Sequence, residues 1–286
     1  MKTLKHLLIL ITLAHLSLFA YDARLKSYPD AKAYYENAVK GDATAAFNLG
    51  YLYQTRFKDD QQAILWYKKA YESGDEELAS DTASNLGRLY KDLKKYKEAE
   101  KWYKKAIEKG NLRAAYNLAY MYDEALHLPK QAIELYKQAY HMGQIGAANS
   151  IGMVYELKLK NYPEAIEWYK KAYNQGDTSG ANNLGYLYQH TLKDIKNAEV
   201  WYKNAARKGN EKAIVNLANL YNKNNNRTLA AAYILSLINN GGHTKQQVLK
   251  YIKKKFNINN QQTLHQAYRL QKTLDIPKHY YDPEFE

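Results

Sequence analysis

A carboxamide side chain recurs before a leucine at regular intervals along this 286-residue chain. The amides are Asn48, Asn85, Asn117, Asn183 and Asn216, and Ser150 takes the corresponding place once, before an isoleucine. A carboxamide can donate a hydrogen bond to a carbonyl oxygen and accept one from an N–H group. This chemistry suits hydrogen-bonded recognition or packing between helices, and it does not suit catalysis.

Further side chains are expected on the same surface as these amides, because helical geometry brings residues three and four positions apart onto one face. They are Phe47, Tyr51, Arg88, Tyr116, Tyr120, Met153, Asn182, Tyr186 and Asn219. Exposed aromatic rings beside amides are typical of a peptide groove. The same rings could instead be partly buried by packing within the chain.

Catalytic and metal-binding patterns are missing from the sequence. No Ser is followed three residues later by Lys, and there is no His-Glu-x-x-His, no Gly-x-Ser-x-Gly and no phosphate-binding glycine loop. The histidines after residue 20 share no ligand spacing; they are His127, His141, His190, His243, His265 and His279. We therefore expect no enzyme activity, no cofactor and no metal.

The elements that position these residues repeat along the chain. Most copies read alanine, two residues, an aromatic pair, two residues, alanine and, a few residues later, glycine. The leading alanines, Ala31, Ala63, Ala99, Ala132, Ala165, Ala198 and Ala231, stand 32, 36, 33, 33, 33 and 33 residues apart. A period in this range predicts stacked helical hairpins. Each hairpin has a helix A, which carries the Leu-Gly pair and the amide, and a helix B, which carries the Trp-Tyr pair.

Small residues recur in the middle of helix A, where glycine costs about 1 kcal/mol relative to alanine. They are Gly50, Gly87, Ala119, Gly152, Gly185 and Ala218. This pattern indicates that a neighbouring helix comes too close for a larger side chain. After helix B, a glycine followed by Asp or Asn predicts a left-handed turn and a helix cap. One such joint, between Gly74 and Leu86, is expected to hold a four-residue insertion, since 12 residues replace the usual 8.

The segments AFNLGYLY, AILWYKKAYESGD, AEKWYKKAIEKGN, AIEWYKKAYNQGD and AEVWYKNAARKGN resemble a Sel1-like repeat protein, a relative of the tetratricopeptide family. The resemblance covers residues 31–242, but the glycine-rich loop usual between helices A and B is shorter here and lacks its glycines. It implies an all-α fold, a right-handed α-solenoid, and a role as an adaptor that binds a protein or peptide. In tetratricopeptide domains an Asn at the place of the recurring amides often holds the backbone of an extended peptide, which makes these amides candidates for that role.

The two ends of the chain differ from the array. Residues Met1–Ala20, with Lys2 and Lys5 before an apolar run, predict a signal peptide cleaved after Ala20. The alternative is an uncleaved anchor, although the run of 14 residues is shorter than the roughly 20 that span a bilayer. Residues 21–242 are expected to form about six hairpins, and residues 243–286 two capping helices and a tail.

Composition adds two constraints. The chain has no cysteine, so neither a lipoprotein anchor nor a disulfide is expected. Its net charge of +13 could attract an anionic envelope surface, or it could reflect lysines scattered on outward faces. Export makes nucleic acid an unexpected partner.

These observations together predict an exported scaffold, periplasmic or secreted, that binds a protein or peptide partner in the bacterial envelope. Two alternatives stay open. One is a β-lactam-binding or β-lactamase-like secreted repeat protein, against which the missing cysteines and Ser-x-x-Lys count. The other is a structural component of an envelope machine such as a flagellar motor or secretion apparatus.

Overall fold

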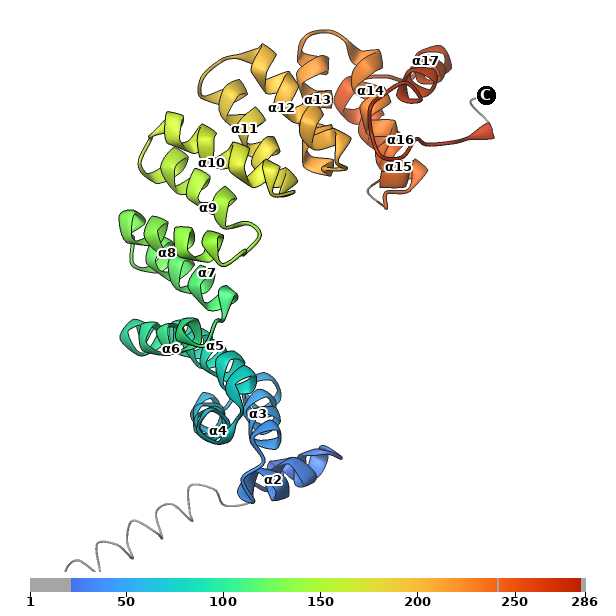
Figure 1. Cartoon of the computed structure of the whole chain (residues 1–286). Helices are drawn as coiled ribbons and strands as arrows, with labels where there is room; N and C mark the ends of the chain where they lie inside the picture. Colours follow the sequence, from blue (N-terminus) through green and yellow to red (C-terminus); the bar gives the residue numbers. More distant parts are fainter. Residues whose placement is uncertain (1–21, 241, 284–286) are drawn as a thin grey trace, which may run out of the picture. The chain divides into compact units, whose positions relative to one another are not determined.

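The computed structural model of the chain describes residues 22–240 and 242–283. Within these ranges the chain forms helices and no β-strand, so the predicted all-α class and the helical-hairpin solenoid are confirmed (Figure 1). The predicted signal peptide, Met1–Ala20, lies outside the described residues.

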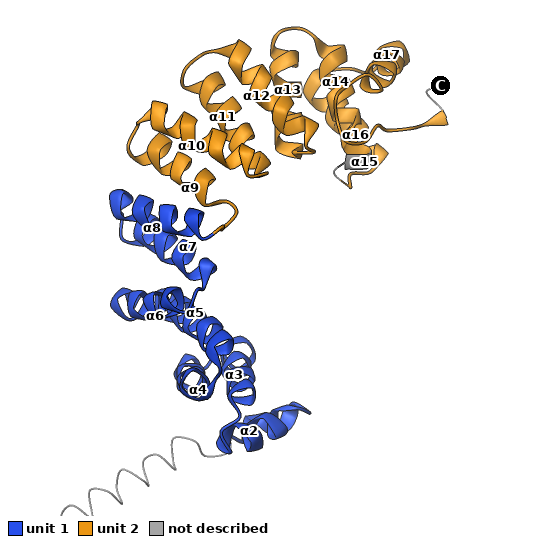
Figure 2. Cartoon of the chain, viewed as in Figure 1, with its two compact units in different colours: residues 1–142 blue, residues 143–286 orange. Residues whose placement is uncertain are grey.

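The helices fall into two compact units, which divide between Met142 and Gly143 (Figure 2). The first unit contains α2 (Ala31–Val39), α3 (Ala43–Leu52), α4 (Asp60–Ser73), α5 (Glu76–Asp92), α6 (Tyr96–Glu108), α7 (Leu112–Tyr120) and α8 (Pro129–His141). The second contains α9 (Ala147–Met153), α10 (Tyr162–Asn174), α11 (Thr178–His190), α12 (Ile195–Arg207), α13 (Glu211–Lys223), α14 (Arg227–Leu235), α15 (Leu237–Asn240), α16 (Lys245–Phe256) and α17 (Gln261–Gln271). Each unit thus holds three A–B hairpins, α3 to α8 in the first and α9 to α14 in the second.

Helix A begins as the sequence predicts. The Asp or Asn after the glycine accepts a hydrogen bond from a backbone N–H in the first turn, at Asp42, Asp75, Asn111, Asp177 and Asn210. The preceding glycine has a positive φ at Gly41, Gly110, Gly176 and Gly209, where a side chain would be strained.

The expectation for the joint after Gly74 is wrong in two respects. Gly74 has an extended conformation, with φ −81° and ψ 158°, and takes no left-handed turn. The four extra residues lie inside α5, which begins at Glu76 and is 17 residues long. Four residues make about one helical turn, so the insertion lengthens the helix and leaves the Leu86-Gly87 pair on the buried face.

The helical glycines have the packing role that their recurrence suggests. A Cβ built at Gly50, Gly87, Gly152 or Gly185 would lie 2.5–2.6 Å from a ring atom of the tyrosine in the paired helix B. The tyrosines are Tyr67, Tyr103, Tyr169 and Tyr202, all buried. Each ring therefore lies directly on the backbone of helix A, and this contact sets the closeness of the hairpin.

The link from helix A to helix B explains why the glycines of the related families are dispensable here. Helix A often ends in a π-helical turn, as at Tyr53–Phe57, Met121–Ala125 and Val154–Lys158. One residue then takes a left-handed conformation with φ between 53° and 62°, at Lys58, Lys94, His127, Lys160, Lys193 and Asn225. A non-glycine residue bears the strain of this turn in every hairpin.

Tryptophans of helix B pack against a tyrosine of the preceding helix B. Ring centroids are 5.9 Å apart for Tyr35–Trp66, 5.1 Å for Tyr71–Trp102 and 5.9 Å for Tyr173–Trp201. Trp66, Trp102 and Trp168 are buried, whereas Trp201 is half-buried. The tryptophans thus join successive hairpins, although Trp201 contributes less buried surface.

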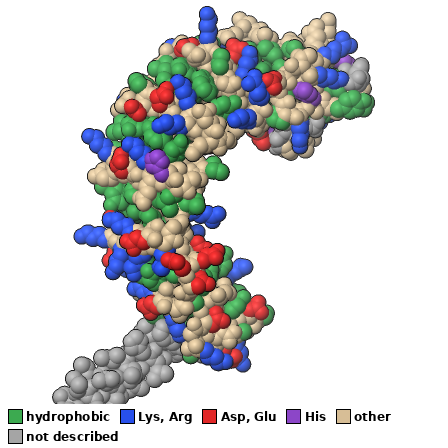
Figure 3. Space-filling model, viewed as in Figure 1, with side chains coloured by type: hydrophobic (Ala, Val, Ile, Leu, Met, Phe, Trp, Pro, Cys, Tyr) green, Lys and Arg blue, Asp and Glu red, His purple; other side chains and the backbone are tan. Residues whose placement is uncertain are grey.

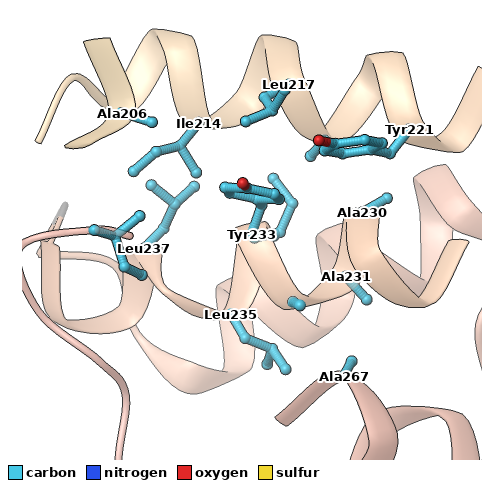
Figure 4. Packing of buried hydrophobic residues seen from close by; sticks show 14 of the residues in the cluster. Ala206, Ile214, Leu217, Tyr221, Ala230, Ala231, Tyr233, Leu235, Leu237 and Ala267 are labelled. Carbon is cyan, nitrogen blue, oxygen red and sulfur yellow. The ribbon is translucent and has the colours of Figure 1, made fainter. Parts of the chain in front are cut away.

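The second unit ends in a well-packed cap. Ile214, Leu217 and Tyr221 of α13 lie against Tyr233 and its neighbours on α14, and Ala267 of α17 faces Leu235 (Figure 4). The tail after α17 packs back as well: the Gln271 side chain bonds to both backbone groups of Tyr280, and Lys245 pairs with the buried Asp282 at 2.5 Å. These contacts hold the tail, as far as Pro283, against the helices of the second unit.

Candidate functional site

The aromatic side chains predicted beside the amides differ in exposure. Tyr51, Tyr120 and Tyr186 are about half exposed, at 54%, 48% and 49%. Phe47 and Tyr116 are half-buried and pack across their hairpins, with centroids 5.5 Å from Tyr67 and 5.2 Å from Tyr136. The tyrosine one residue after the Leu-Gly pair is therefore the ring that helix A presents to solvent.

In the second unit each recurring amide bonds to an Asn of the preceding helix A. Asn216 Nδ2 donates to Asn182 Oδ1 at 3.0 Å, and Asn183 Nδ2 donates to Asn149 Oδ1 at 2.9 Å. Asn182 Nδ2 donates to Asn183 Oδ1 at 3.4 Å, which joins the two bonds into one chain across α13, α11 and α9. Asn183 and Asn216 therefore stabilise the stacking of neighbouring A helices.

In the first unit the same positions lack these bonds. The acceptor in the second unit is an Asn two residues before the Leu-Gly pair of the preceding helix A, and Phe47 and Ser84 occupy that place in α3 and α5. Asn48 and Asn117 form no side-chain hydrogen bond with any described residue, and Asn85 accepts one from Arg88 at 3.1 Å.

Three of the residues that the sequence singles out line one groove of the first unit. Phe47, Asn85 and Asn117 surround a groove of about 220 Å³ together with Asp81, Ser84, Arg88, Asn111 and Arg113. Two further hollows share lining residues with this groove. One shares Arg88 and is lined also by Tyr51, and the other shares Arg113 and is lined also by Glu76 and Glu77. We name the part lined by Asn85, Arg88, Arg113 and Asn117 the amide–guanidinium groove.

The charges in this groove are incompletely paired. Neither Arg88 nor Arg113 forms an ion pair with a described residue, whereas the Asp81 carboxylate accepts a hydrogen bond from Asn111 Nδ2 at 3.0 Å. A guanidinium offers five N–H donors in a planar fork that matches a carboxylate. The groove can therefore hydrogen-bond a polypeptide backbone through its amides and a carboxylate through its arginines.

Sequence reasoning found part of this groove and missed the rest. Asn85, Arg88, Asn117 and Phe47 were predicted, and Arg113, Ser84 and Asp81 were not. Arg113 stands four residues before Asn117, so the helical spacing could have identified it. Tyr116 and Tyr120 do not line the groove, and Asn48 lies on the neighbouring helix α3.

In residues 22–240 and 242–283, no group of three or more His, Cys, Asp or Glu side chains could hold a metal ion. None of the described helices combines the length and the apolar character needed to span a bilayer.

Comparisons with known proteins agree with the fold. The Sel1 repeat family matches residues 43–75, 112–144, 152–177 and 178–210, and a tetratricopeptide repeat family matches residues 80–110. No curated protein matches the sequence.

Several solved structures are similar to the chain. One is a protective antigen present in uropathogenic Escherichia coli strains and displaying an SLR fold, with 26% identity and a TM-score of 0.53 over 85% of this chain and 55% of that one. A Sel1 repeat protein from Oxalobacter formigenes has 23% identity and a TM-score of 0.47, over 76% and 88% of the two chains. YrrB, a TPR protein with an unusual peptide-binding site, has 24% identity and a TM-score of 0.42, over 63% and 92%. The chain thus spans 55% of the length of the first of these structures.

Proposed function

The chain belongs to the Sel1-like repeat proteins, a tetratricopeptide-related class of α-solenoid, and we propose that it is a scaffold that binds a protein partner through the amide–guanidinium groove. Repeat folds of this kind generally mediate protein–protein interaction. The function is binding, and no described group is arranged as a nucleophile with a base.

The observation that carries this proposal is the difference between the two units. In the second unit Asn183 and Asn216 each donate a hydrogen bond to an Asn of the preceding helix A. In the first unit Asn117 forms no side-chain hydrogen bond with a described residue and Asn85 bonds only to Arg88, and the groove that they line also holds two guanidiniums that form no ion pair with a described residue. A buried amide left without a partner costs about 1–3 kcal/mol. An amide that is open to solvent avoids this cost by bonding to water, and it can exchange that water for a group of a ligand.

The partner chemistry follows from the lining. An extended segment of polypeptide would exchange backbone hydrogen bonds with Asn85 and Asn117, and a carboxylate on that segment would pair with Arg88 or Arg113. Tyr51, exposed and lining a hollow that shares Arg88 with the groove, offers a ring for an apolar side chain of the same segment.

Photo-crosslinking tests the binding surface. A photoreactive phenylalanine analogue replaces Tyr51 beside the groove or, as the matched control, Tyr186, which holds the same repeat position in the second unit. We expect cross-linked partners from position 51 and none from position 186. Adding Arg88→Ala and Asn117→Ala should abolish the cross-link while leaving the melting temperature unchanged.

Amide substitutions supply the second half of that test. Asn85→Ala with Asn117→Ala should weaken capture of the partner without lowering the melting temperature, since neither amide joins two helices. Asn183→Ala with Asn216→Ala should lower the melting temperature first, because each removes an inter-helix bond. Equal partner capture by the first pair and the unmodified chain would refute the assignment of the groove.

We also propose that the protein works in the bacterial envelope after export. Support comes from the composition of Met1–Ala20, with two lysines before an apolar run and a small residue at the expected cleavage site. N-terminal sequencing of the native protein should begin at Tyr21, and a chain that retains residues 1–20 in the cytoplasmic fraction would refute this part.

A further inference from the structure

The positive charge of this protein is concentrated in one stretch of sequence. Residues 212–274 contain ten Lys and Arg and no Asp or Glu, which leaves 32 basic and 29 acidic residues in the rest of the chain. This stretch forms α13 to α17 of the second unit. Ten of the thirteen net positive charges of the chain thus belong to this stretch.

The lysines of α16 lie on its outer side. The helix buries Val248, Ile252 and Phe256, spaced four residues apart, against the core. Lys250, Lys253 and Lys254 project from the remaining surface and are exposed, as is Lys255 beside them. We name these four lysines the basic face; Figure 3 shows basic side chains projecting from the C-terminal helices.

No acidic group neutralises the basic face among the described residues. None of its four lysines forms an ion pair. The acidic residues that border the acid-free stretch already have partners: Glu211 lies 3.5 Å from His243, Asp275 pairs with Arg207, and Asp282 pairs with Lys245. The positive potential of α16 is therefore directed at solvent.

We infer that the basic face binds the headgroups of an anionic phospholipid surface. Lysine is a compact, strongly hydrated point charge, which suits diffuse attraction to many phosphates rather than bidentate recognition of one. Clusters of four to eight basic residues on an amphipathic helix are typical of attraction to anionic lipids. The apolar side of α16 is buried in the core, so binding is peripheral and involves no insertion of the helix.

This inference goes beyond the proposed function, because it concerns the opposite end of the chain from the amide–guanidinium groove and a different kind of partner. Its failure would leave the groove untouched, and the reverse is equally true.

Vesicle co-sedimentation with the full chain tests it. One set of vesicles contains phosphatidylglycerol and phosphatidylcholine in equal amounts, and the other contains phosphatidylcholine alone. The variant carries Lys250→Gln, Lys253→Gln and Lys254→Gln. The control carries Lys94→Gln, Lys95→Gln and Lys97→Gln, which removes the same charge from exposed positions of the first unit.

We expect binding to the anionic vesicles that weakens with added salt and exceeds binding to phosphatidylcholine alone. Each lysine near an anionic bilayer contributes about a fivefold factor to the partition coefficient, so the triple variant should bind about a hundredfold more weakly. The control should match the unmodified chain. Residues 1–20 are common to all three proteins, so their contribution cancels.

Three results would overturn the inference. Equal loss in the variant and the control would show that only total charge matters. Equal binding to both kinds of vesicle would show that the headgroup charge is not recognised. Binding of polyglutamate or single-stranded DNA through the same lysines, without binding of vesicles, would assign the basic face to an acidic macromolecule instead.

Discussion

The hydroxyl of Tyr169 is the most informative single group to remove. Tyr169 Oη donates a hydrogen bond to Glu156 Oε2 at 2.6 Å, and the two residues are 1% and 8% exposed. Burial and the Glu156 carboxylate raise the pKa of Tyr169, so the phenol stays protonated and remains the donor. Tyr169→Phe would leave the carboxylate without this bond inside the hairpin.

Tyr103 provides the matched comparison within the same chain. It holds the same repeat position, and its ring lies on Gly87 as that of Tyr169 lies on Gly152. Its hydroxyl is buried without a hydrogen-bond partner, because the residue 13 positions earlier is Tyr90 where the other repeat has Glu156. Tyr103→Phe removes an unsatisfied group and no bond.

The three Tyr→Phe substitutions are expected to change the free energy of unfolding by different amounts. A hydrogen bond to a charged group contributes about 1.5–3 kcal/mol, and an unpaired buried charge adds to its loss, so Tyr169→Phe should cost about 2–3 kcal/mol. Tyr103→Phe should be neutral or should stabilise the fold by up to about 1 kcal/mol. Tyr202→Phe, which loses a neutral bond to Gln189 Oε1 at 2.8 Å, should cost about 1 kcal/mol.

Urea and thermal unfolding followed by circular dichroism would measure these differences. For a unit of this size each kcal/mol shifts the melting temperature by about 2–4 °C. Glu156→Gln should be milder than Tyr169→Phe, since Gln54 and Gln189 accept the equivalent bonds in other repeats. A cost for Tyr103→Phe as large as that for Tyr169→Phe would refute the reasoning.

Three further predictions concern stability, each measurable by urea unfolding. Gly185→Ala should destabilise the fold by about 1 kcal/mol, because a Cβ 2.6 Å from the Tyr202 ring costs about 1–3 kcal/mol and the higher helix propensity of alanine returns only about 1 kcal/mol. A stabilised variant would contradict the ring contact. The control is Ala119→Gly, at a position that already accommodates alanine, and it should cost about 1 kcal/mol. Lys193→Gly should stabilise by about 1 kcal/mol, because it relieves a left-handed residue with φ 59°; Lys196→Gly, in the first turn of α12, serves as the control and should destabilise. Trp66→Ala should cost about 3–5 kcal/mol, because it truncates a buried aromatic side chain. Trp201→Ala should cost less, because Trp201 is only half-buried, and equal costs would show that side-chain burial does not set the loss of stability.

Much of the fold could be predicted because each repeat is specified by residue spacings within a single helix or turn. The alanine, tyrosine and Leu-Gly positions of each copy share one helical face, so a period of 33 residues gives both helices and their buried sides. Caps such as Asp42 and Asn210 act within three residues of their own position, which is why they were predictable. The insertion after Gly74 was misplaced because extra residues that form one helical turn look the same in sequence as a longer joint.

The candidate site could be predicted only as a set of equivalent positions. Asn117 and Asn183 are indistinguishable within their own helices, and their difference depends on a residue in the preceding helix A. The sequence by itself determined the period, the hairpins, the caps and the excess of charge between residues 212 and 274. Tertiary structure decided which amides bond to each other, which arginines lie beside free amides, and how the tail packs. The physical reason is that helix periodicity acts over a few residues, whereas the partner of a side chain about 34 positions away depends on how two helices align.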